Sequence, residues 1–282
     1  MRKKQVIVYI SGGLGNQLFQ LGAAKYISDR GWDVFVDPIR NDINGVRNTQ
    51  IIELTEAFRI GYITRKPLIL KALKIWPLRS MYFCFLKIKS QDEPQEFCTP
   101  SLSYKFKNKN RIFGYWQTIV TANLIVEKIL KLKNLEPNSD SIAVHIRRGD
   151  YLDTKHQTHG ILDGSYFLDA VEVLREISGV RKIVIFTDSP ELVKSEKWIR
   201  KWAHYDYEFS NSTEPWETLI EMAKFQYIVC SNSTFSWWAA HLGYDKKIVL
   251  PRMWFVNREI PESLVIPGAL ILDSNFMKVD QI

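Results

Sequence analysis

The amino-acid sequence predicts an α/β protein made of two Rossmann-like domains that face each other across a cleft. Two stretches of the chain alternate short apolar, β-rich runs with segments of helical apolar spacing, one at the beginning and one from about residue 141 onwards. This alternation is typical of a parallel sheet covered by helices. A polar, proline-containing segment, residues 131–140, separates the two stretches. We therefore expect domains at residues 1–136 and 137–282.

Length and composition are those of a folded globular chain. The 282 residues suffice for two domains of ordinary size, and 46% of them are hydrophobic and 24% charged. The net charge of +7 favours an anionic partner, which could be a phosphate-bearing substrate, a membrane surface or nucleic acid. No basic stripe coincides with a known nucleic-acid-binding motif, so we expect no nucleic-acid partner. The three cysteines show no C-x-x-C spacing, which argues against a disulfide framework and favours the cytoplasm.

The first stretch predicts a strand, a turn, a helix and a second strand, in that order. Residues 6–10 form an apolar β-rich run, residues 11–15 form a glycine-rich turn, and residues 17–29 have helical apolar spacing. A second β-rich run follows at residues 33–37. Residues 38–110 are rich in lysine and aromatic residues, and we expect helices and loops there without defined boundaries.

The second stretch predicts strands and helices in regular alternation. Strands are expected at residues 142–146, 182–186, 227–230 and 247–250. Helices are expected at residues 165–177, 190–202, 214–225 and 233–242, with Pro190 well placed in a first turn. Open α/β sheets bind ligands at the carboxyl ends of their strands, so the residues that follow these strands are the first candidates for a site.

No uncharged stretch reaches the roughly 20 residues that a membrane-spanning helix needs. The nearest, residues 68–88, interleaves Leu, Ile, Trp and Phe with Lys71, Lys74, Arg79 and Lys87. A basic, apolar segment of this kind can lie in a membrane interface, which would give a cytoplasmic protein a peripheral contact with the inner membrane. An amphipathic helix pair packed on the protein explains the same pattern, and the sequence does not choose between the two.

The first candidate binding segment runs from Ser11 to Gln17 with the sequence SGGLGNQ. Glycines between a strand and a helix let backbone N–H groups approach a phosphate, and the helix N-terminus adds partial positive charge. The dinucleotide pattern G-x-G-x-x-G, started at Gly13, fails because Leu18 stands in place of a glycine. A plain tight turn is the alternative. The candidate binding residues of this segment are Gly13, Gly15, Asn16 and Gln17.

The second candidate segment, His145 to Tyr151, has the sequence HIRRGDY and ends a predicted buried strand. Unpaired guanidinium groups would be costly there, whereas Arg147 and Arg148 could grip a pyrophosphate bidentately. A leaving nucleoside diphosphate needs its charge neutralised, either by a divalent metal or by such groups. The Asp-x-Asp pattern that often holds such a metal is absent, which favours arginine. The alternative is a structural ion pair between Arg147 and Asp150.

Two further segments follow predicted strands. Ser231-Asn232-Ser233-Thr234-Phe235 opens a predicted helix, so its side-chain donors and backbone N–H groups could converge on one anion. Helix capping explains one of these residues but not the cluster. Asp188, in Phe186-Thr187-Asp188-Ser189, either caps the next helix or faces the cleft. The acidic and histidine residues between Asp150 and His159 match no zinc spacing, and we expect no metal site there.

Together these segments resemble the bacterial α-1,2-fucosyltransferases of glycosyltransferase family 11. That family carries Gly-Gly-Leu-Gly-Asn-Gln, His-x-Arg-Arg-Gly-Asp-Tyr and Asn-Ser-Thr-Phe-Ser-Trp-Trp-Ala motifs, which stand here at residues 12–17, 145–151 and 232–239. Residues 186–189 are similar to the family's Phe-Ser-Asp-Asp, with Thr and Ser at two positions. Three motifs in the right order make the resemblance specific, although residues 40–140 contribute little to it.

The resemblance implies a GT-B architecture and the inverting, metal-independent transfer of L-fucose from GDP-fucose, without a cofactor, to the 2-hydroxyl of a galactoside. The acceptor would be a galactose-containing oligosaccharide, lipid-linked or free, in surface polysaccharide (O-antigen) synthesis. Arg147 is then the expected pyrophosphate-binding residue and Asp150 the first candidate for the base, with Asp153 and His159 behind it. The implied donor-binding residues are Gly13, Gly15, Asn16, Gln17, His145, Arg148, Asp188, Asn232, Ser233, Thr234 and Phe235.

Other functions stay open on the residues alone, because nothing in them identifies guanine or fucose. The chain could be a glycosyltransferase that uses another nucleotide sugar. It could also bind a nucleotide sugar without catalysis, in which case it would bind GDP tightly and transfer nothing. A basic adaptor for membranes or nucleic acid is the third alternative, and binding to anionic liposomes or polynucleotide at physiological salt would reveal it.

Overall fold

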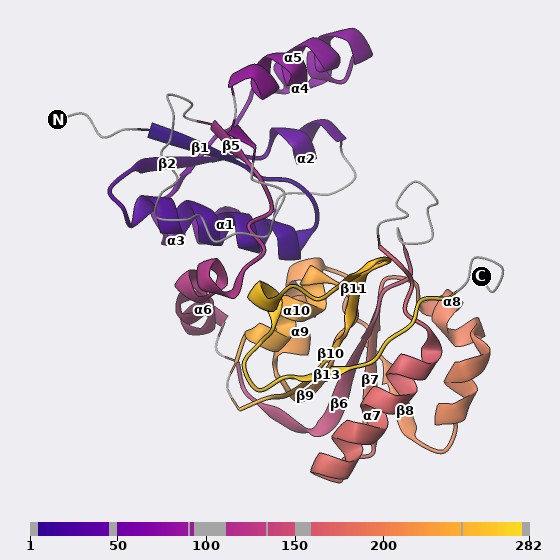
Figure 1. Ribbon diagram of the computed structural model, residues 1–282. Coiled ribbons are helices and arrows are strands. Elements are labelled where there is room, and N and C mark those ends of the chain that lie inside the picture. Colours follow the sequence, from indigo (N-terminus) through magenta and orange to yellow (C-terminus); the bar gives the residue numbers. More distant parts are fainter. Residues whose placement is uncertain are drawn as a thin grey trace. The chain divides into compact units, whose positions relative to one another are not determined.

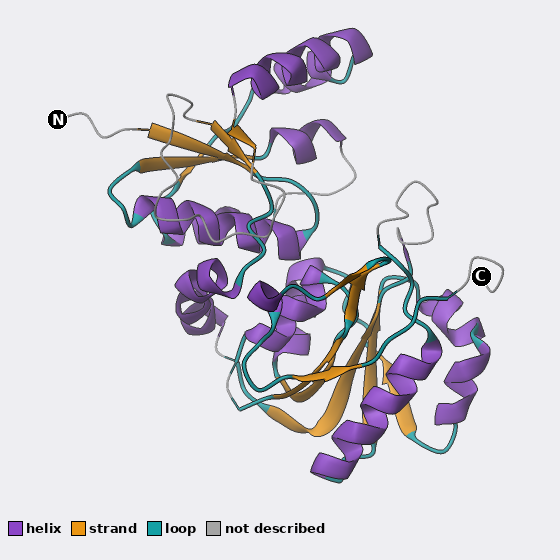
Figure 2. Ribbon diagram, viewed as in Figure 1, coloured by secondary structure: helices purple, strands orange, loops and turns teal. Residues whose placement is uncertain are grey.

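The structure, a computed structural model, describes residues 5–44, 50–89, 91–92, 111–133, 135–149, 159–243 and 245–277. The chain divides into two compact units, Met1–Leu132 and Lys133–Ile282 (Figure 1). The division falls at the end of a long helix and within the polar segment at residues 131–140. Each unit is an α/β layer with a sheet whose strands are all parallel, so the predicted α/β fold of two Rossmann-like units is confirmed (Figure 2).

The first unit is built on a sheet with the strand order β3-β2-β1-β5-β4. Its helices lie on both faces of the sheet, with α1 and α3 on one face and α2, α4 and α5 on the other (Figure 1). The strands are β1 Gln5–Tyr9, β2 Asp33–Asp37, β3 Gly61–Tyr62, β4 Gln91–Asp92 and β5 Arg111–Phe113. The helices are α1 Leu14–Ser28, α2 Ile39–Asn44, α3 Ile52–Ala57, α4 Pro67–Leu73, α5 Trp76–Lys89 and α6 Ile119–Lys133.

The glycine-rich segment is more helical than the sequence indicated. The expected helix began at Gln17, whereas α1 begins at Leu14, so Gly15, Asn16 and Gln17 all lie in its first turn. Only Gly12 needs the conformational freedom of glycine, because its φ is 83° and an added Cβ would lie 2.8 Å from the Asn16 side-chain nitrogen. The tight turn therefore ends earlier than predicted, and the helix N-terminus lies nearer to the end of β1.

The second unit is built on a sheet with the strand order β13-β10-β9-β6-β7-β8, and a small antiparallel β11–β12 ribbon lies outside it. Its strands are β6 Asn138–Ile146, β7 Lys182–Thr187, β8 Asp206–Phe209, β9 Phe225–Val229, β10 Lys247–Pro251, β11 Met253–Phe255, β12 Arg258–Glu259 and β13 Leu270–Leu272. Its helices are α7 Gly164–Ser178, α8 Pro190–Ser195, α9 Pro215–Ala223 and α10 Thr234–His241, with short 3₁₀ helices at η3 Lys197–Trp202 and η4 Glu262–Leu264. The sequence did not predict β8, β11, β12 or β13.

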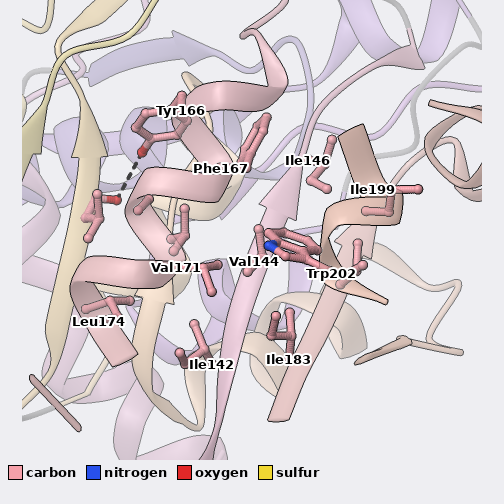
Figure 3. Packing of buried hydrophobic residues seen from close by; sticks show 14 of the residues in the cluster. Ile142, Val144, Ile146, Tyr166, Phe167, Val171, Leu174, Ile183, Ile199 and Trp202 are labelled. Atoms are coloured by element: carbon pink, nitrogen blue, oxygen red, sulfur yellow. Dashed lines mark hydrogen bonds between the residues drawn. The ribbon is translucent and has the colours of Figure 1, made fainter. Parts of the chain in front are cut away.

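The core of the second unit forms where α7 packs on the sheet, chiefly against β6, β9 and β10. The central strand β6 is buried along its apolar run, as expected for a parallel strand covered on both faces. Figure 3 shows the apolar face of α7 turned towards the sheet, with Phe167, Val171 and Leu174 near Val144, Ile142 and Ile183. The Tyr166 hydroxyl donates to the Cys230 carbonyl oxygen at 2.7 Å and so ties α7 to the end of β9. This core supports the carboxyl ends of the strands that carry the candidate site.

One predicted helix is broken. Residues 190–202 were expected to form a single helix, but Glu196 has extended backbone angles and separates α8 from η3. The physical reason lies in its side chain, which is turned onto the buried Arg148 guanidinium group and not along a helix surface. A charge pair between distant segments has no local periodicity, so the sequence pattern could not reveal it.

Candidate active site

The motifs of the second unit follow three adjacent strands. The segment at residues 145–149 ends β6, Asp188 follows β7, and Ser231–Phe235 follow β9. Beginning at β6, the chain adds β7 and β8 on one side, then crosses to add β9 and β10 on the other. The sheet therefore has its topological switch point between β6 and β9. Ligands of open α/β sheets bind outside the carboxyl ends of the strands at such a point.

A hydrogen bond across the switch point joins two of the motifs. The His145 Nδ1 atom lies 2.6 Å from the Ser231 hydroxyl oxygen, although the two residues are 86 positions apart. The His145 ring also stacks on Phe235 at a centroid distance of 5.5 Å. Burial, with a smaller contribution from the neighbouring Arg147 cation, lowers the pKa of His145 to about 3. At neutral pH His145 is therefore an uncharged residue that holds the end of β6 against the loop after β9.

Arg147 is a partly exposed cation at this point. Its guanidinium Nη1 atom lies 2.9 Å from a carboxylate oxygen of Asp188, and 21% of the Arg147 side chain is exposed. The same carboxyl group accepts from the backbone N–H groups of Arg148 at 3.0 Å and Gly149 at 3.2 Å. A Cβ at Gly149 would lie 2.1 Å from that carboxylate, so the close approach requires glycine. Asp188 thus orients both the backbone and the cation of the second motif.

The neighbouring Arg148 is enclosed in the protein. Its side chain is 1% exposed, and it donates from Nε and Nη2 to the two carboxylate oxygens of Glu196 at 2.6 and 2.9 Å. The Nη1 atom donates to the Arg147 carbonyl oxygen at 3.2 Å, and the Trp198 indole N–H also donates to Glu196. The bidentate pair satisfies a guanidinium that would otherwise be buried without a counter-charge. Arg148 therefore supports the strand end behind Arg147, and a direct contact between Arg148 and a donor stays a prediction.

The segment Ser231–Phe235, the third motif, is held in place by hydrogen bonds of Asn232 and Ser233. Asn232 donates from its side-chain nitrogen to the carbonyl oxygens of Gly160 at 3.0 Å and Trp254 at 3.3 Å. Ser233 caps α10, because its hydroxyl accepts from the Phe235 N–H at 3.3 Å. Thr234 and Phe235 are the least buried residues of the motif. The first turn of α10, with the partial positive charge of a helix N-terminus, begins directly beside the switch point.

The glycine-rich segment lies at the switch point of the first sheet, as the other motifs lie at the switch point of the second. The first sheet has its switch point between β1 and β5, and the segment follows β1. Gln20 bridges the point, accepting from the Ser11 N–H and donating to the Gly114 carbonyl oxygen, each at 2.9 Å. Asn41 bonds both backbone polar groups of Gly12 at 3.1 and 3.3 Å. The segment is therefore a fixed element whose backbone is held by side chains.

The amide side chains that the sequence predicted to contact the donor, Asn16 and Gln17, make hydrogen bonds within the protein. Gln17 is buried, donates to the Gly12 carbonyl oxygen at 3.0 Å and accepts from the Gln50 N–H at 2.9 Å. Asn16 accepts from the Gln117 side chain at 3.0 Å. The contact of Asn16 and Gln17 with a donor sugar or phosphate stays a prediction.

Comparison with known proteins agrees with the motif order. The sequence profile described as "Glycosyl transferase family 11" matches residues 103–261, more than half of the chain. The chain belongs to glycosyl transferase family 11. The matched region of this family 11 chain contains the segments at residues 145–151, 186–189 and 232–239. It does not contain the glycine-rich segment at residues 12–17.

Two curated relatives of this family 11 glycosyltransferase come from Escherichia coli. It is 28% identical over 301 residues to "O-antigen biosynthesis glycosyltransferase WbnK", covering 88% of this chain and 94% of the relative. It is 24% identical over 291 residues to "Alpha-1,2-colitosyltransferase", covering 90% of this chain and 94% of the relative. The resemblance to family 11 is therefore confirmed, and glycosyl transfer is the activity of the family.

Two solved structures show more distant likenesses. A crystal structure of POFUT1 in complex with GDP matches with a TM-score of 0.45 and 11% identity, covering 88% of this chain and 98% of that chain. The E. coli heptosyltransferase WaaC with ADP matches with a TM-score of 0.46 and 12% identity, covering 95% and 93%. Both likenesses are distant, so the family assignment rests on the sequence match.

Several site residues of the family 11 chain could not be found from its sequence. Three residues outside every motif hold a motif in place through a hydrogen bond to a distant residue. They are Glu196, which bonds Arg148, Gln20, which bonds Gly114, and Asn41, which bonds Gly12. Arg147 pairs with Asp188, a partner that the sequence did not suggest, while the expected pair with Asp150 involves a residue outside the described part of the chain. Asp188 does not cap α8 either, because Ser189 is the N-cap residue and its side chain makes no capping bond.

Part of the expected site lies outside the described residues. Asp150, the first candidate for the base, and Asp153 are not described. His159 is described, and the centroid of its ring lies 5.2 Å from that of the Phe255 ring. In the part of the chain that the structure describes, no three His, Cys, Asp or Glu side chains gather as a metal site would need. Among the same residues, no helix is long and apolar enough to cross a membrane.

Proposed function

We propose that this family 11 glycosyltransferase transfers L-fucose from GDP-fucose to the 2-hydroxyl of a galactoside, with inversion at the anomeric carbon. The acceptor is a galactose-containing oligosaccharide of a surface polysaccharide, and the reaction takes place in the cytoplasm. The names of the two E. coli relatives, which include O-antigen biosynthesis and an α-1,2 linkage, support this setting. The observation that carries the proposal is the partly exposed Arg147 cation at the switch point of the second sheet.

The donor diphosphate is assigned to the space outside β6 and β9. Arg147 and the N-terminal turn of α10 supply positive charge from two sides of the switch point, and a diphosphate is the part of the donor that needs it. His145 is uncharged, so it adds no cation and instead keeps the two segments together. Asp188 keeps Arg147 oriented before the donor arrives, and a preorganised charge is the most effective kind in catalysis.

Transfer is a single in-line displacement without a metal. The acceptor oxygen forms its bond to the anomeric carbon while the bond from that carbon to the β-phosphate oxygen breaks, and GDP leaves with the electron pair. The acceptor proton passes to a base, for which Asp150 stays the first candidate. Arg147 stabilises the charge that develops on the leaving diphosphate, which a bound divalent cation would otherwise do. The sequence supports this assignment, because it contains no Asp-x-Asp pattern.

A second candidate donor carries colitose. One relative is named for α-1,2-colitosyl transfer and shares 24% identity over 90% of this chain, so the same linkage can accompany another sugar in a similar sequence. The Arg147 and α10 assignments apply to any nucleoside diphosphate sugar, since they concern the diphosphate. Sugar identity is therefore the part of the proposal that needs a direct measurement.

The test is a donor panel with purified full-length protein. GDP-fucose, GDP-linked colitose, GDP-mannose, UDP-galactose and UDP-glucose are each incubated with a β-galactoside, with and without EDTA, and released nucleotide and glycosylated product are quantified. We expect product from GDP-fucose, with the new bond at the 2-hydroxyl and an unchanged rate in EDTA. Turnover of another donor in preference to GDP-fucose would reject fucose and keep the diphosphate site. Loss of turnover in EDTA that added Mg²⁺ restores would reject metal independence.

A further inference from the structure

A helical hairpin in the first unit packs on the core of that unit and also exposes large apolar side chains. The basic hairpin, defined here as α4, α5 and the residues that join them, consists of two helices that lie side by side at one end of the unit (Figure 1). Leu70, Leu73 and Tyr82 pack against Tyr9, Ile39 and Phe113. These three side chains therefore belong to the core of the unit, whereas other side chains of the hairpin are exposed to solvent.

The hairpin exposes large apolar side chains. Ile69 is 49% exposed, Ile75 55%, Leu78 45% and Met81 69%. Met81 and Ile75 are the two most exposed large hydrophobic residues of the described chain. Single exposed apolar residues are normal on a protein surface, but four within 13 successive positions make a patch that indicates a binding surface.

The charge along this stretch of the sequence has one sign, although Arg65 is paired with Asp37 in the fold. Residues 57–91 contain Arg59, Arg65, Lys66, Lys71, Lys74, Arg79, Lys87 and Lys89, and no aspartate or glutamate. The whole chain has 31 acidic residues among 282, so about four would be expected in a window of this length. Lys66, Lys71 and Lys74 are exposed beside the apolar patch. A partner that binds this surface would therefore be anionic.

The combination of the two properties selects the kind of partner. A polynucleotide would use the lysines but would leave Leu78 and Met81 in water, whereas a second protein would need acidic groups interleaved with apolar ones in the matching pattern. A bilayer with anionic headgroups meets both requirements at once, because lysines bind the headgroups while apolar side chains enter the boundary with the acyl chains. We propose that the basic hairpin binds peripherally to the surface of a membrane that contains anionic lipids. This contact is separate from the proposed transfer reaction.

The test is binding of the full-length protein to vesicles, measured by flotation at physiological salt. We expect binding to phosphatidylcholine vesicles that contain phosphatidylglycerol, and little binding to phosphatidylcholine alone. The triple variant Lys66→Gln, Lys71→Gln, Lys74→Gln should bind on the order of 100-fold more weakly, from roughly a fivefold loss per cation. A matched triple variant of exposed lysines in the second unit, Lys194→Gln, Lys197→Gln, Lys201→Gln, should bind as the unchanged protein does.

A second variant separates a membrane from other anionic partners. Leu78→Ser with Met81→Ser should weaken vesicle binding about tenfold or more, because the apolar contact is lost while every charge remains. Circular dichroism and GDP binding check that each variant is folded. The proposal is overturned if both lysine triples lose vesicle binding equally, or if the serine variant binds vesicles normally. It is also overturned if the protein binds polynucleotide but not vesicles, or if the patch instead forms a dimer that the serine variant dissociates.

Discussion

At the scale of single residues, Arg147 carries the chemistry of the proposed site. Its guanidinium group is presented at the end of a buried strand, held by Asp188 and still partly exposed. Its neighbour Arg148 has the same chemical group but is enclosed by Glu196. Two adjacent arginines therefore have different tasks, and the difference arises from which carboxylate each one contacts.

Removing the Arg147 cation should slow the reaction strongly. Arg147→Ala is expected to lower kcat/KM by roughly 100-fold or more, the usual loss for one preorganised charge donor. The measurement is steady-state transfer with GDP-fucose and a β-galactoside, beside the exposed control Arg200→Ala, for which we expect unchanged kinetics. A folded Arg147→Ala protein with nearly normal turnover would show that the diphosphate binds elsewhere.

Breaking the Arg148–Glu196 pair should affect stability first. Glu196→Gln leaves a guanidinium group that is 1% exposed without its counter-charge, and we expect the free energy of unfolding to fall by about 3–5 kcal/mol. Urea unfolding measures the change. The matched control is Glu191→Gln on α8, five positions before Glu196, because the Glu191 side chain is 85% exposed and pairs with Lys194 at the surface. Equal effects of the two variants would mean that the buried pair contributes no more than a surface pair.

At the scale of secondary structure elements, the first turn of α10 has a capping residue and is also part of the proposed diphosphate site. Ser233 caps this helix, and the same turn is the proposed site for the donor diphosphate. Capping needs a side-chain oxygen at position 233 that accepts a hydrogen bond from the helix. Binding of a diphosphate needs a residue at that position that carries no negative charge. These two requirements can be separated by substitution at one position.

Ser233→Asp should separate capping from diphosphate binding. Aspartate is as good an N-cap as serine, so the free energy of unfolding should stay within about 0.5 kcal/mol, while Ser233→Ala should lose about 1 kcal/mol. The new carboxylate should repel the diphosphate and weaken GDP binding, measured by calorimetry, more than tenfold. The reverse exchange at the cap of α7, Asp163→Ser, is the control and should change neither quantity appreciably. Normal GDP affinity in Ser233→Asp would place the diphosphate away from α10.

At the scale of the whole molecule, buried uncharged histidines should make the second unit sensitive to acid. Burial lowers the pKa of His145 to about 3, with Arg147 adding to the effect, and lowers the pKa of His241 to about 4, with Lys246 adding to it. In the unfolded chain both titrate near 6.5. As the pH falls below about 6.5, the unfolded chain therefore takes up protons that the folded chain does not, and stability falls.

Each of these two histidines should contribute about 1.4 kcal/mol per pH unit below pH 6.5. Urea unfolding between about pH 6.5 and about pH 5 measures the slope, and His241→Gln should reduce it by the share of one histidine. His204→Gln, the same substitution at an exposed histidine, is measured beside it as the control. A slope that is the same in His241→Gln as in the unchanged protein would mean that this ring takes up its proton without unfolding.

Also at the scale of the whole molecule, the strand order of each sheet explains why the motifs of a unit lie close together at its switch point. The glycine-rich segment, the segment at residues 145–149 and the segment at 231–235 all lie at switch points. The sequence shows that each segment follows a strand, because the apolar run before it is visible. It does not show that β9 pairs with β6, since that pairing depends on which strand the chain returns to after β8.

The sequence by itself determined the α/β class, half of the strands of the second unit, the family and the segments that carry the candidate chemistry. These properties depend on local periodicity and on motifs of a few consecutive residues, which are readable along the chain. Only the tertiary structure decided that Asp188 holds Arg147, that Glu196 encloses Arg148 and breaks a helix, and that His145 bonds Ser231. Each of these pairs joins residues about 40 or more positions apart, and the energy of a buried charge or hydrogen bond depends on the partner that folding brings to it.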